Sequence, residues 1–141
     1  MFERCPFCQI INREKEAYIV YEDEKCMAFL DAYPATEGHT LVIPKEHYEN
    51  IYEISEDCLA HLIRICKRLA LDYKRIFQTI GLNIIQSNGI AAKQTIFHFH
   101  IHLVPRYEQD GLSLFRHHFP RSENNLLQTY HKIINFPKEI K

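Results

Sequence analysis

The sequence predicts an α+β fold, in which an antiparallel five-stranded sheet packs against one long helix and a short N-terminal helix. One observation is a single apolar stripe that repeats in steps of three and four over about seven helical turns, between Ser55 and Gly81. Ser55 is a good N-cap and Gly81 is a typical helix stop. The other observation is a set of short strand-like runs, most of them ended by turn residues or proline. One long helix beside several strands is typical of the α+β class.

The remaining elements are placed by local signals along the chain. A short helix is expected from about Pro6 to Arg13, because proline suits the first helical turn. A loop is expected over residues 32–38, and a second amphipathic helix over residues 126–134. The basic stretch of residues 111–121 is expected to be a surface loop, the alternative being a patch that recognises phosphates or the leaving group. The five predicted strands are Tyr18–Glu22, Cys26–Asp31, Thr40–Ile43, Leu82–Ser87 and Thr95–Val104.

Composition limits the class of protein. A chain of 141 residues is expected to form one domain with a sizeable core. The formal net charge of −1 provides no basic field for nucleic acid. No run of about 18 apolar residues predicts a membrane span, and the N-terminus lacks the apolar stretch of a signal peptide. We therefore expect a cytoplasmic protein whose five cysteines are reduced, without a nucleic-acid or membrane partner.

Three histidines, His98, His100 and His102, alternate with apolar residues in the last predicted strand. Alternate strand residues point to opposite faces, so the imidazoles share one face, roughly 6–7 Å apart, and the apolar residues face the long helix. A solvated polar row would not need histidine, so the pattern indicates chemistry. Two interpretations are open. Two of the histidines could hold a catalytic metal ion. Alternatively, a neutral imidazole could attack phosphorus, its other ring nitrogen being held by an acceptor.

A cysteine pair, Cys5 and Cys8, lies near the N-terminus. Two thiolates one helical turn apart can share a zinc ion, but a tetrahedral structural site needs two further ligands. His47 and His98 are the best candidates for these. The alternative is a reduced pair of buried cysteines with His47 at the surface. A thioredoxin-like redox function is poorly supported, because no βαβ pattern precedes the motif.

The segment His98-Phe99-His100-Ile101-His102-Leu103-Val104 resembles the signature of the histidine triad family. The resemblance covers about residues 1–107, and the extension 108–141 adds little to it. It implies a single domain of the family's fold, whose sheet continues across a homodimer. The other segments that carry the resemblance are Cys5–Ile10, Leu30–Asp31, Gly38–Pro44, Asn88–Gly89 and Gln94–Thr95.

The resemblance implies a hydrolase or transferase that acts at the α-phosphate of purine nucleotide conjugates, either nucleoside phosphoramidates or dinucleoside polyphosphates. His100 matches the nucleophile that becomes transiently nucleotidylated, and His102 and His39 match residues that orient it and position the phosphate. Asp31 matches the residue that holds the ribose hydroxyls. Asn88, Gln94 and Thr95 match contacts to the phosphate or the leaving group. In zinc-containing bacterial members, the residues matched by Cys5, Cys8, His47 and His98 hold a structural Zn²⁺.

Two rival functions belong to other classes. The protein could be a nucleotide-binding interaction module with little turnover, although every expected catalytic position is filled. It could also be a metallohydrolase with the three triad histidines around one catalytic ion. Sensitivity of the chemical step to a chelator would separate the metallohydrolase from an enzyme with a structural zinc.

Overall fold

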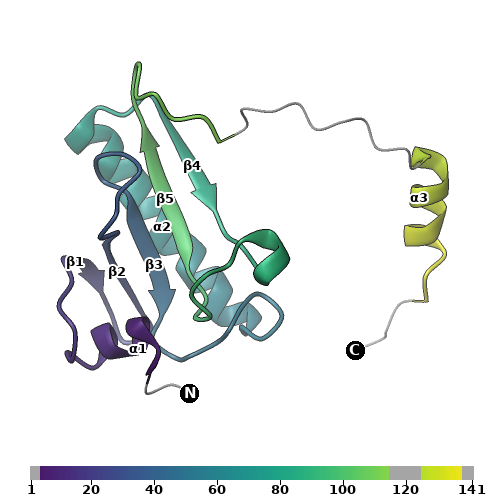
Figure 1. Ribbon diagram of the computed structural model, residues 1–141, viewed down its shortest axis with the longest axis horizontal. Helices are drawn as coiled ribbons and strands as arrows, with labels where there is room; N and C mark the ends of the chain where they lie inside the picture. Colours follow the sequence, from purple (N-terminus) through teal and green to yellow (C-terminus); the bar gives the residue numbers. More distant parts are fainter. Residues whose placement is uncertain (1–3, 115–124, 138–141) are drawn as a thin grey trace.

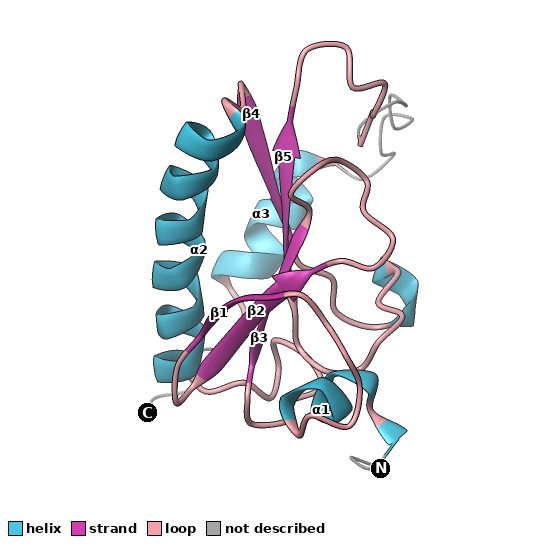
Figure 2. Ribbon diagram, turned by 90° about the vertical axis from the view of Figure 1, so that its left-hand side faces the viewer, coloured by secondary structure: helices cyan, strands magenta, loops and turns pink. Residues whose placement is uncertain are grey.

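The computed structural model describes residues 4–114 and 125–137. Its core is one antiparallel sheet of five strands in the order β1-β2-β3-β5-β4, and α2 packs along one face of it (Figures 1 and 2). The predicted α+β class is confirmed. The elements are α1 (Pro6–Ile11), β1 (Ile19–Glu22), β2 (Cys26–Leu30), β3 (Thr40–Pro44), α2 (Glu56–Phe77), β4 (Gly81–Ile85), the 3-10 turn η2 (Ile90–Ala92), β5 (Ile101–Arg106) and α3 (Leu126–Ile134).

The long helix α2 begins as predicted but ends earlier. The Ser55 hydroxyl accepts a hydrogen bond from the Cys58 backbone N–H and caps the first turn. The helix stops after 22 residues, about six turns, because Gln78 adopts the left-handed conformation with φ 53°. The prediction that Gly81 ends the helix was therefore wrong, and Gly81 is the first residue of β4. The buried face of α2 consists of Leu62, Ile65, Cys66, Leu69 and Tyr73.

The strand that carries the histidines is shifted along the chain relative to the prediction. It was expected at Thr95–Val104, but β5 comprises Ile101–Arg106, so His102 lies in the strand whereas His98 and His100 precede it. Residues 95–100 have no ladder partner. Strand β4 ends at Ile85, opposite His102, and the ladder with β3 stops at the Val42–Ile101 pair although β3 continues to Pro44. The Phe99 N–H instead donates to the Tyr48 carbonyl at 2.7 Å. Pro105 is tolerated inside the strand, because the ladder with β3 already ends at Leu103.

The predicted separation of apolar and histidine side chains into two faces is retained for residues 99–103, but Phe97, which was expected on the apolar face, is 37% exposed and lies outside the core that α2 covers. Phe99, Ile101 and Leu103 are buried in the core that α2 covers. Against the opposite face, α1 contributes Phe7 and Ile10 to a second apolar cluster. This cluster also contains Met27, Phe29, Leu41 and Ile43 from β2 and β3.

Outside the sheet, helix α3 lies where it was predicted, with the Asn125 side chain as its N-cap. In Figure 1 it lies apart from the sheet, and none of its residues is buried. The predicted loop at 111–121 falls partly outside the described residues.

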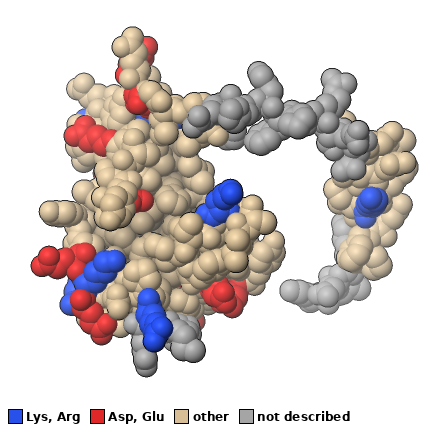
Figure 3. All heavy atoms as spheres, viewed as in Figure 1, with Lys and Arg blue, Asp and Glu red and all other residues tan. Residues whose placement is uncertain are grey.

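Basic and acidic side chains lie next to one another along the lower edge of the body in Figure 3. No helix in the described ranges is both long and apolar enough to cross a bilayer.

Candidate functional site

The middle histidine of the triad has a defined hydrogen-bonding state. His100 Nδ1 lies 2.8 Å from the carbonyl oxygen of His98, so Nδ1 carries the hydrogen and donates it. In the neutral ring, Nε2 then keeps its lone pair. Burial lowers the pKa of His100, which favours this neutral form at neutral pH. The Phe7 ring packs edge-on against the imidazole, with 5.3 Å between ring centroids, and restricts its orientation.

His39 and His102 form a hydrogen-bonded chain beside His100. The Ala35 N–H donates to His39 Nδ1 at 3.0 Å, so the hydrogen of the neutral His39 ring is on Nε2. This Nε2–H donates to His102 Nδ1 at 2.9 Å, which leaves the His102 hydrogen on its own Nε2. The His102 ring is 5.0 Å from the His100 ring, centroid to centroid. The site thus places a lone pair and an N–H donor on neighbouring imidazoles.

Acidification is expected to destabilise the protein through His102. Burial, with smaller contributions from His100 and His39, lowers the His102 pKa to about 4, whereas an unfolded histidine titrates near 6.5. The unfolded chain therefore takes up this proton first, and stability is lost as the pH falls from about 6.5 towards 4. For this partly exposed ring we expect a loss of about 1–3 kcal/mol.

The measurement is urea unfolding of the wild type and of His102→Gln at pH 7.5, 6 and 5. The variant should lose less stability on acidification than the wild type does, because it lacks this group. Equal losses in the two proteins would contradict the assignment.

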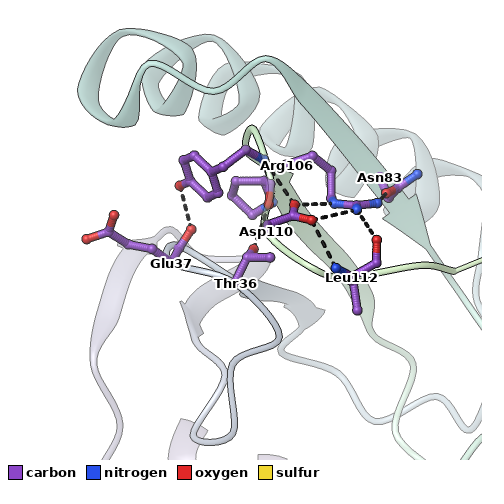
Figure 4. Close-up of polar contacts among 8 residues, drawn as sticks. Thr36, Glu37, Asn83, Arg106, Asp110 and Leu112 are labelled. Carbon is purple, nitrogen blue, oxygen red and sulfur yellow. Dashed lines mark hydrogen bonds and ion pairs between the residues drawn. The ribbon is translucent and has the colours of Figure 1, made fainter.

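The loop that carries His39 is tied to the end of β5. The Thr36 hydroxyl donates to the Pro105 carbonyl at 2.6 Å, and the Tyr107 hydroxyl donates to the Glu37 carbonyl at 2.7 Å. Figure 4 shows both contacts on the same side of the sheet end. Because Pro105 lies in β5 and Tyr107 directly follows it, both bonds tie the His39 loop to the strand that carries His102.

Arg106 organises the segment that follows β5 (Figure 4). Its guanidinium donates to both carboxylate oxygens of Asp110, at 2.7 and 2.9 Å, and to Asn83 Oδ1 at 2.9 Å. It also donates to the Leu112 carbonyl. The bidentate contact holds the pKa of Asp110 well below its ordinary value. This cluster rigidifies the turn from which Tyr107 reaches the His39 loop.

A cavity of about 1070 Å³ opens in front of His100 and His102. One wall is apolar and comes from α1, β2 and β3, through Phe7, Ile10, Phe29 and Leu41. Asp31 lies at this wall, where one carboxylate oxygen accepts the Tyr33 N–H at 2.8 Å and the other lies 3.5 Å from His39 Nε2. The remaining polar lining between β4 and β5 consists of Ser87, Lys93 and Thr95.

Of the three residues matched to phosphate contacts, Thr95 lines the cavity. Gln94 is 4% exposed, and its side chain donates to the carbonyls of Glu49 and Ile96 and accepts from the Gly89 N–H at 2.7 Å. The Asn88 side chain exchanges two hydrogen bonds with Gln86 and accepts the Ile51 N–H. These contacts hold the β4–β5 connection in place, so they give Gln94 and Asn88 a positioning role.

The four predicted metal ligands, Cys5, Cys8, His47 and His98, meet between α1 and the start of the histidine segment, with their ligand atoms all within 4.8 Å of one another. His98 Nδ1 lies 3.4 Å from Cys5 Sγ, 3.6 Å from Cys8 Sγ and 3.1 Å from His47 Nδ1. Cys8 Sγ lies 3.3 Å from His47 Nδ1. Tetrahedral Zn²⁺ with ordinary Zn–S and Zn–N bonds places its ligand atoms about 3.3–3.8 Å apart. The observed separations of 3.1–3.6 Å lie within about 0.2 Å of this range, so the residues fit this ion.

The orientation of His98 is fixed from its other ring nitrogen. The Nε2–H donates to the Pro44 carbonyl at 2.9 Å, which leaves Nδ1 as the lone-pair donor facing the cysteines. His98 is fully buried, and burial lowers its pKa to about 4, so the ring is neutral as a metal ligand requires. The backbone carbonyl of this same residue accepts the hydrogen bond from His100.

A second group of potential ligands, Asp23, Cys26 and His61, is instead closed by hydrogen bonds. Asp23 accepts from His61 Nε2 at 2.7 Å, from the Tyr21 hydroxyl at 2.8 Å and from the backbone N–H groups of Lys25 and Cys26. Its acceptor positions are therefore used, and the cluster fastens α2 to the β1–β2 turn.

The chain belongs to the histidine triad (HIT) family, because residues 12–109 match the family model described as HIT domain. A HIT family protein from Bacillus anthracis has a similar crystal structure, with a TM-score of 0.85, 35% sequence identity and 94% of each chain covered. A structure described as a Zn-bound histidine triad family protein from Mycobacterium smegmatis is 37% identical, with a TM-score of 0.77, and covers 81% of this chain and 83% of that one. The Arabidopsis thaliana protein named Adenylylsulfatase HINT3 is 40% identical over 120 residues, which are 80% of this chain and 59% of that protein.

Sequence reasoning missed several parts of the site. Ser87 and Lys93 were not selected, because neither belongs to a motif, and only the β4–β5 connection brings them to the cavity. The carbonyls of Pro44 and His98, which set the two ring tautomers, carry no side-chain signal at all.

Proposed function

We propose that this protein is a hydrolase or transferase that cleaves purine nucleotide conjugates, such as phosphoramidates and dinucleoside polyphosphates, at the α-phosphate through a nucleotidyl–His100 intermediate. The observation that carries the proposal is the hydrogen bond from His100 Nδ1 to the His98 carbonyl. It leaves Nε2 as a neutral nucleophile in a cavity large enough for a nucleotide. The relative named as an adenylylsulfatase supports chemistry at an adenylyl phosphorus.

In the first step, the His100 Nε2 lone pair forms a bond to the α-phosphorus. The bond from phosphorus to the leaving group breaks, and its electron pair departs with that group. The Nε2–H of His102 donates a hydrogen bond to the phosphoryl oxygen, on which negative charge develops. Water then attacks phosphorus, the bond from phosphorus to Nε2 breaks, and its electron pair returns to Nε2. The attacking water loses a proton to solvent, the nucleoside monophosphate leaves, and neutral His100 is restored. In this arrangement the apolar wall receives the base, and Asp31 accepts hydrogen bonds from the ribose hydroxyls.

We further propose that Cys5, Cys8, His47 and His98 hold one structural Zn²⁺. The fit of their ligand atoms to a tetrahedral ion and the zinc-bound relative support this. When bound, the ion supplies a cross-link between α1 and the histidine segment. Because the His98 carbonyl orients His100, this cross-link would also steady the nucleophile.

The wider organisation follows the family. We propose a single domain with a core of about residues 1–107 and an extension over 108–141. We also propose a homodimer whose sheet continues from one protomer to the other. The edge position of β4 leaves one side of that strand for such pairing. The five cysteines are all free, which supports a reducing, cytoplasmic environment.

The direct test is a substrate panel of a fluorogenic adenosine phosphoramidate, an acyl adenylate, adenylyl sulfate and a dinucleoside polyphosphate. Release of a nucleoside monophosphate from at least one of them is expected. Nucleotide binding without turnover of any member would instead favour an interaction module.

A further inference from the structure

Lys93 occupies a backbone position that does not favour lysine. It ends the η2 turn in the left-handed conformation, with φ 71° and ψ 25°. Glycine adopts this conformation without penalty, whereas a residue with a Cβ atom is disfavoured. The Lys93 side chain is exposed and lines the same cavity as His100 and His102. The backbone conformation therefore does not account for a lysine at this position. The property of lysine that can account for it is its positive charge.

The sheet order places Lys93 on a particular side of the cavity. Strand β2, which leads into Asp31, and strand β4, which leads towards Lys93, lie on opposite sides of β5 in the sheet. The apolar wall of α1 and β2 is on the Asp31 side. A nucleoside bound to that wall, with its α-phosphate at His100, directs its leaving group towards Lys93.

Lys93 also provides the positive charge on the side of the cavity that faces the leaving group. Among described residues, the cavity lining includes the cations Arg13, Lys15 and Lys93. Arg13 and Lys15 follow α1 and so belong to the nucleoside side, where Arg13 forms an ion pair with Glu22 at 2.5 Å. On the leaving-group side, the other described lining residues from the β4–β5 connection are neutral.

We propose that Lys93 is a specificity residue that favours leaving groups which depart as anions, such as sulfate or phosphate. The inference rests on the proposed function. When the bond from phosphorus to a sulfate or phosphate oxygen breaks, that oxygen keeps the electron pair and needs no proton. The Lys93 ammonium offsets the developing negative charge. An amine leaving group takes the electron pair together with a proton from solvent water and departs neutral, so it gains little from the lysine.

The experiment compares kcat/KM for adenylyl sulfate with kcat/KM for an adenosine phosphoramidate that has a neutral amine leaving group. Lys93→Met removes the charge and keeps a side chain on the left-handed backbone. Lys93→Gly removes the charge and also relieves the backbone. Both should lower the sulfate-to-amine ratio about tenfold. Lys93→Arg should restore most of the ratio, and Lys67→Met on the exposed side of α2 should leave it unchanged.

Raising the ionic strength gives a second readout. It should lower the ratio in the wild type and have a smaller effect in Lys93→Met, because salt screens an exposed charge. A sulfate-to-amine ratio that does not change in Lys93→Met, or that changes in Lys93→Met but not in Lys93→Gly, would overturn the role of the charge. Failure of the wild type to hydrolyse adenylyl sulfate, with turnover of the phosphoramidate intact, would overturn the inference alone. Failure to hydrolyse any member of the substrate panel would overturn the proposed function itself, and the inference with it.

Discussion

Replacement of His100 by glycine is expected to lower kcat/KM by more than about 10³-fold, because the variant lacks the nucleophile that divides the reaction into two steps. Imidazole added to the solution should restore part of the activity, since the space left by the ring can admit it and its nitrogen can attack the same phosphorus. Steady-state hydrolysis of a fluorogenic adenosine phosphoramidate, with and without imidazole, is the measurement.

Two further variants separate chemistry from folding. His100→Gln keeps a side chain of similar size, so it should retain the fold and yet show the same loss of activity. His61→Gln, on α2 and outside the cavity lining, should leave kcat/KM close to that of the wild type. Near-wild-type turnover by His100→Gln would show that His100 does not form the covalent intermediate.

Loss of the proposed zinc should have the largest effect on stability. Helix α1 has six residues, too few to form a stable helix without tertiary contacts. The ion would attach it to His47 and His98 in addition to the packing of Phe7 and Ile10. Replacing Cys5 and Cys8 by serine should therefore lower the free energy of unfolding by about 3–5 kcal/mol, or Tm by roughly 10–15 °C.

Elemental analysis and thermal unfolding test this expectation together. The wild type and the control Cys66→Ala should each contain one zinc per chain, and the double serine variant should contain none. A double variant with an unchanged Tm would contradict the structural role. Removal of zinc by a chelator should lower Tm clearly and should have a much smaller effect on kcat, when kcat is measured well below Tm. A kcat lost on chelation from a protein that stays folded would favour a catalytic ion at the triad histidines.

The sequence predicted those parts of the fold that depend on local periodicity. The apolar spacing of α2 and α3 and the alternation around the three histidines each depend on side chains within one segment. The boundaries of β5 depend instead on which residues pair with β3 and β4, and no pattern within residues 95–104 contains that information. The end of α2 at the left-handed Gln78 was missed because Gly81 is the more typical stop signal.

The same distinction applies to the site. The spacing of Cys5 and Cys8, together with the candidates His47 and His98, indicated the proposed ligand set, because metal ligands must be particular residue types. The states of the rings could not be predicted, since backbone groups of Ala35, Pro44 and His98 determine them. The amide of Gln94 is bound to three backbone groups, which residue identity alone does not indicate.

The covalent intermediate is the central claim, and rapid quenching followed by mass spectrometry tests it most directly. During turnover of a poorly hydrolysed phosphoramidate analogue, base-quenched protein should contain a fraction heavier by one nucleotidyl group. Fragmentation should locate that group on His100, and the fraction should be absent in His100→Gln. Steady product release without any adduct on the protein, or an adduct on a different residue, would contradict the account.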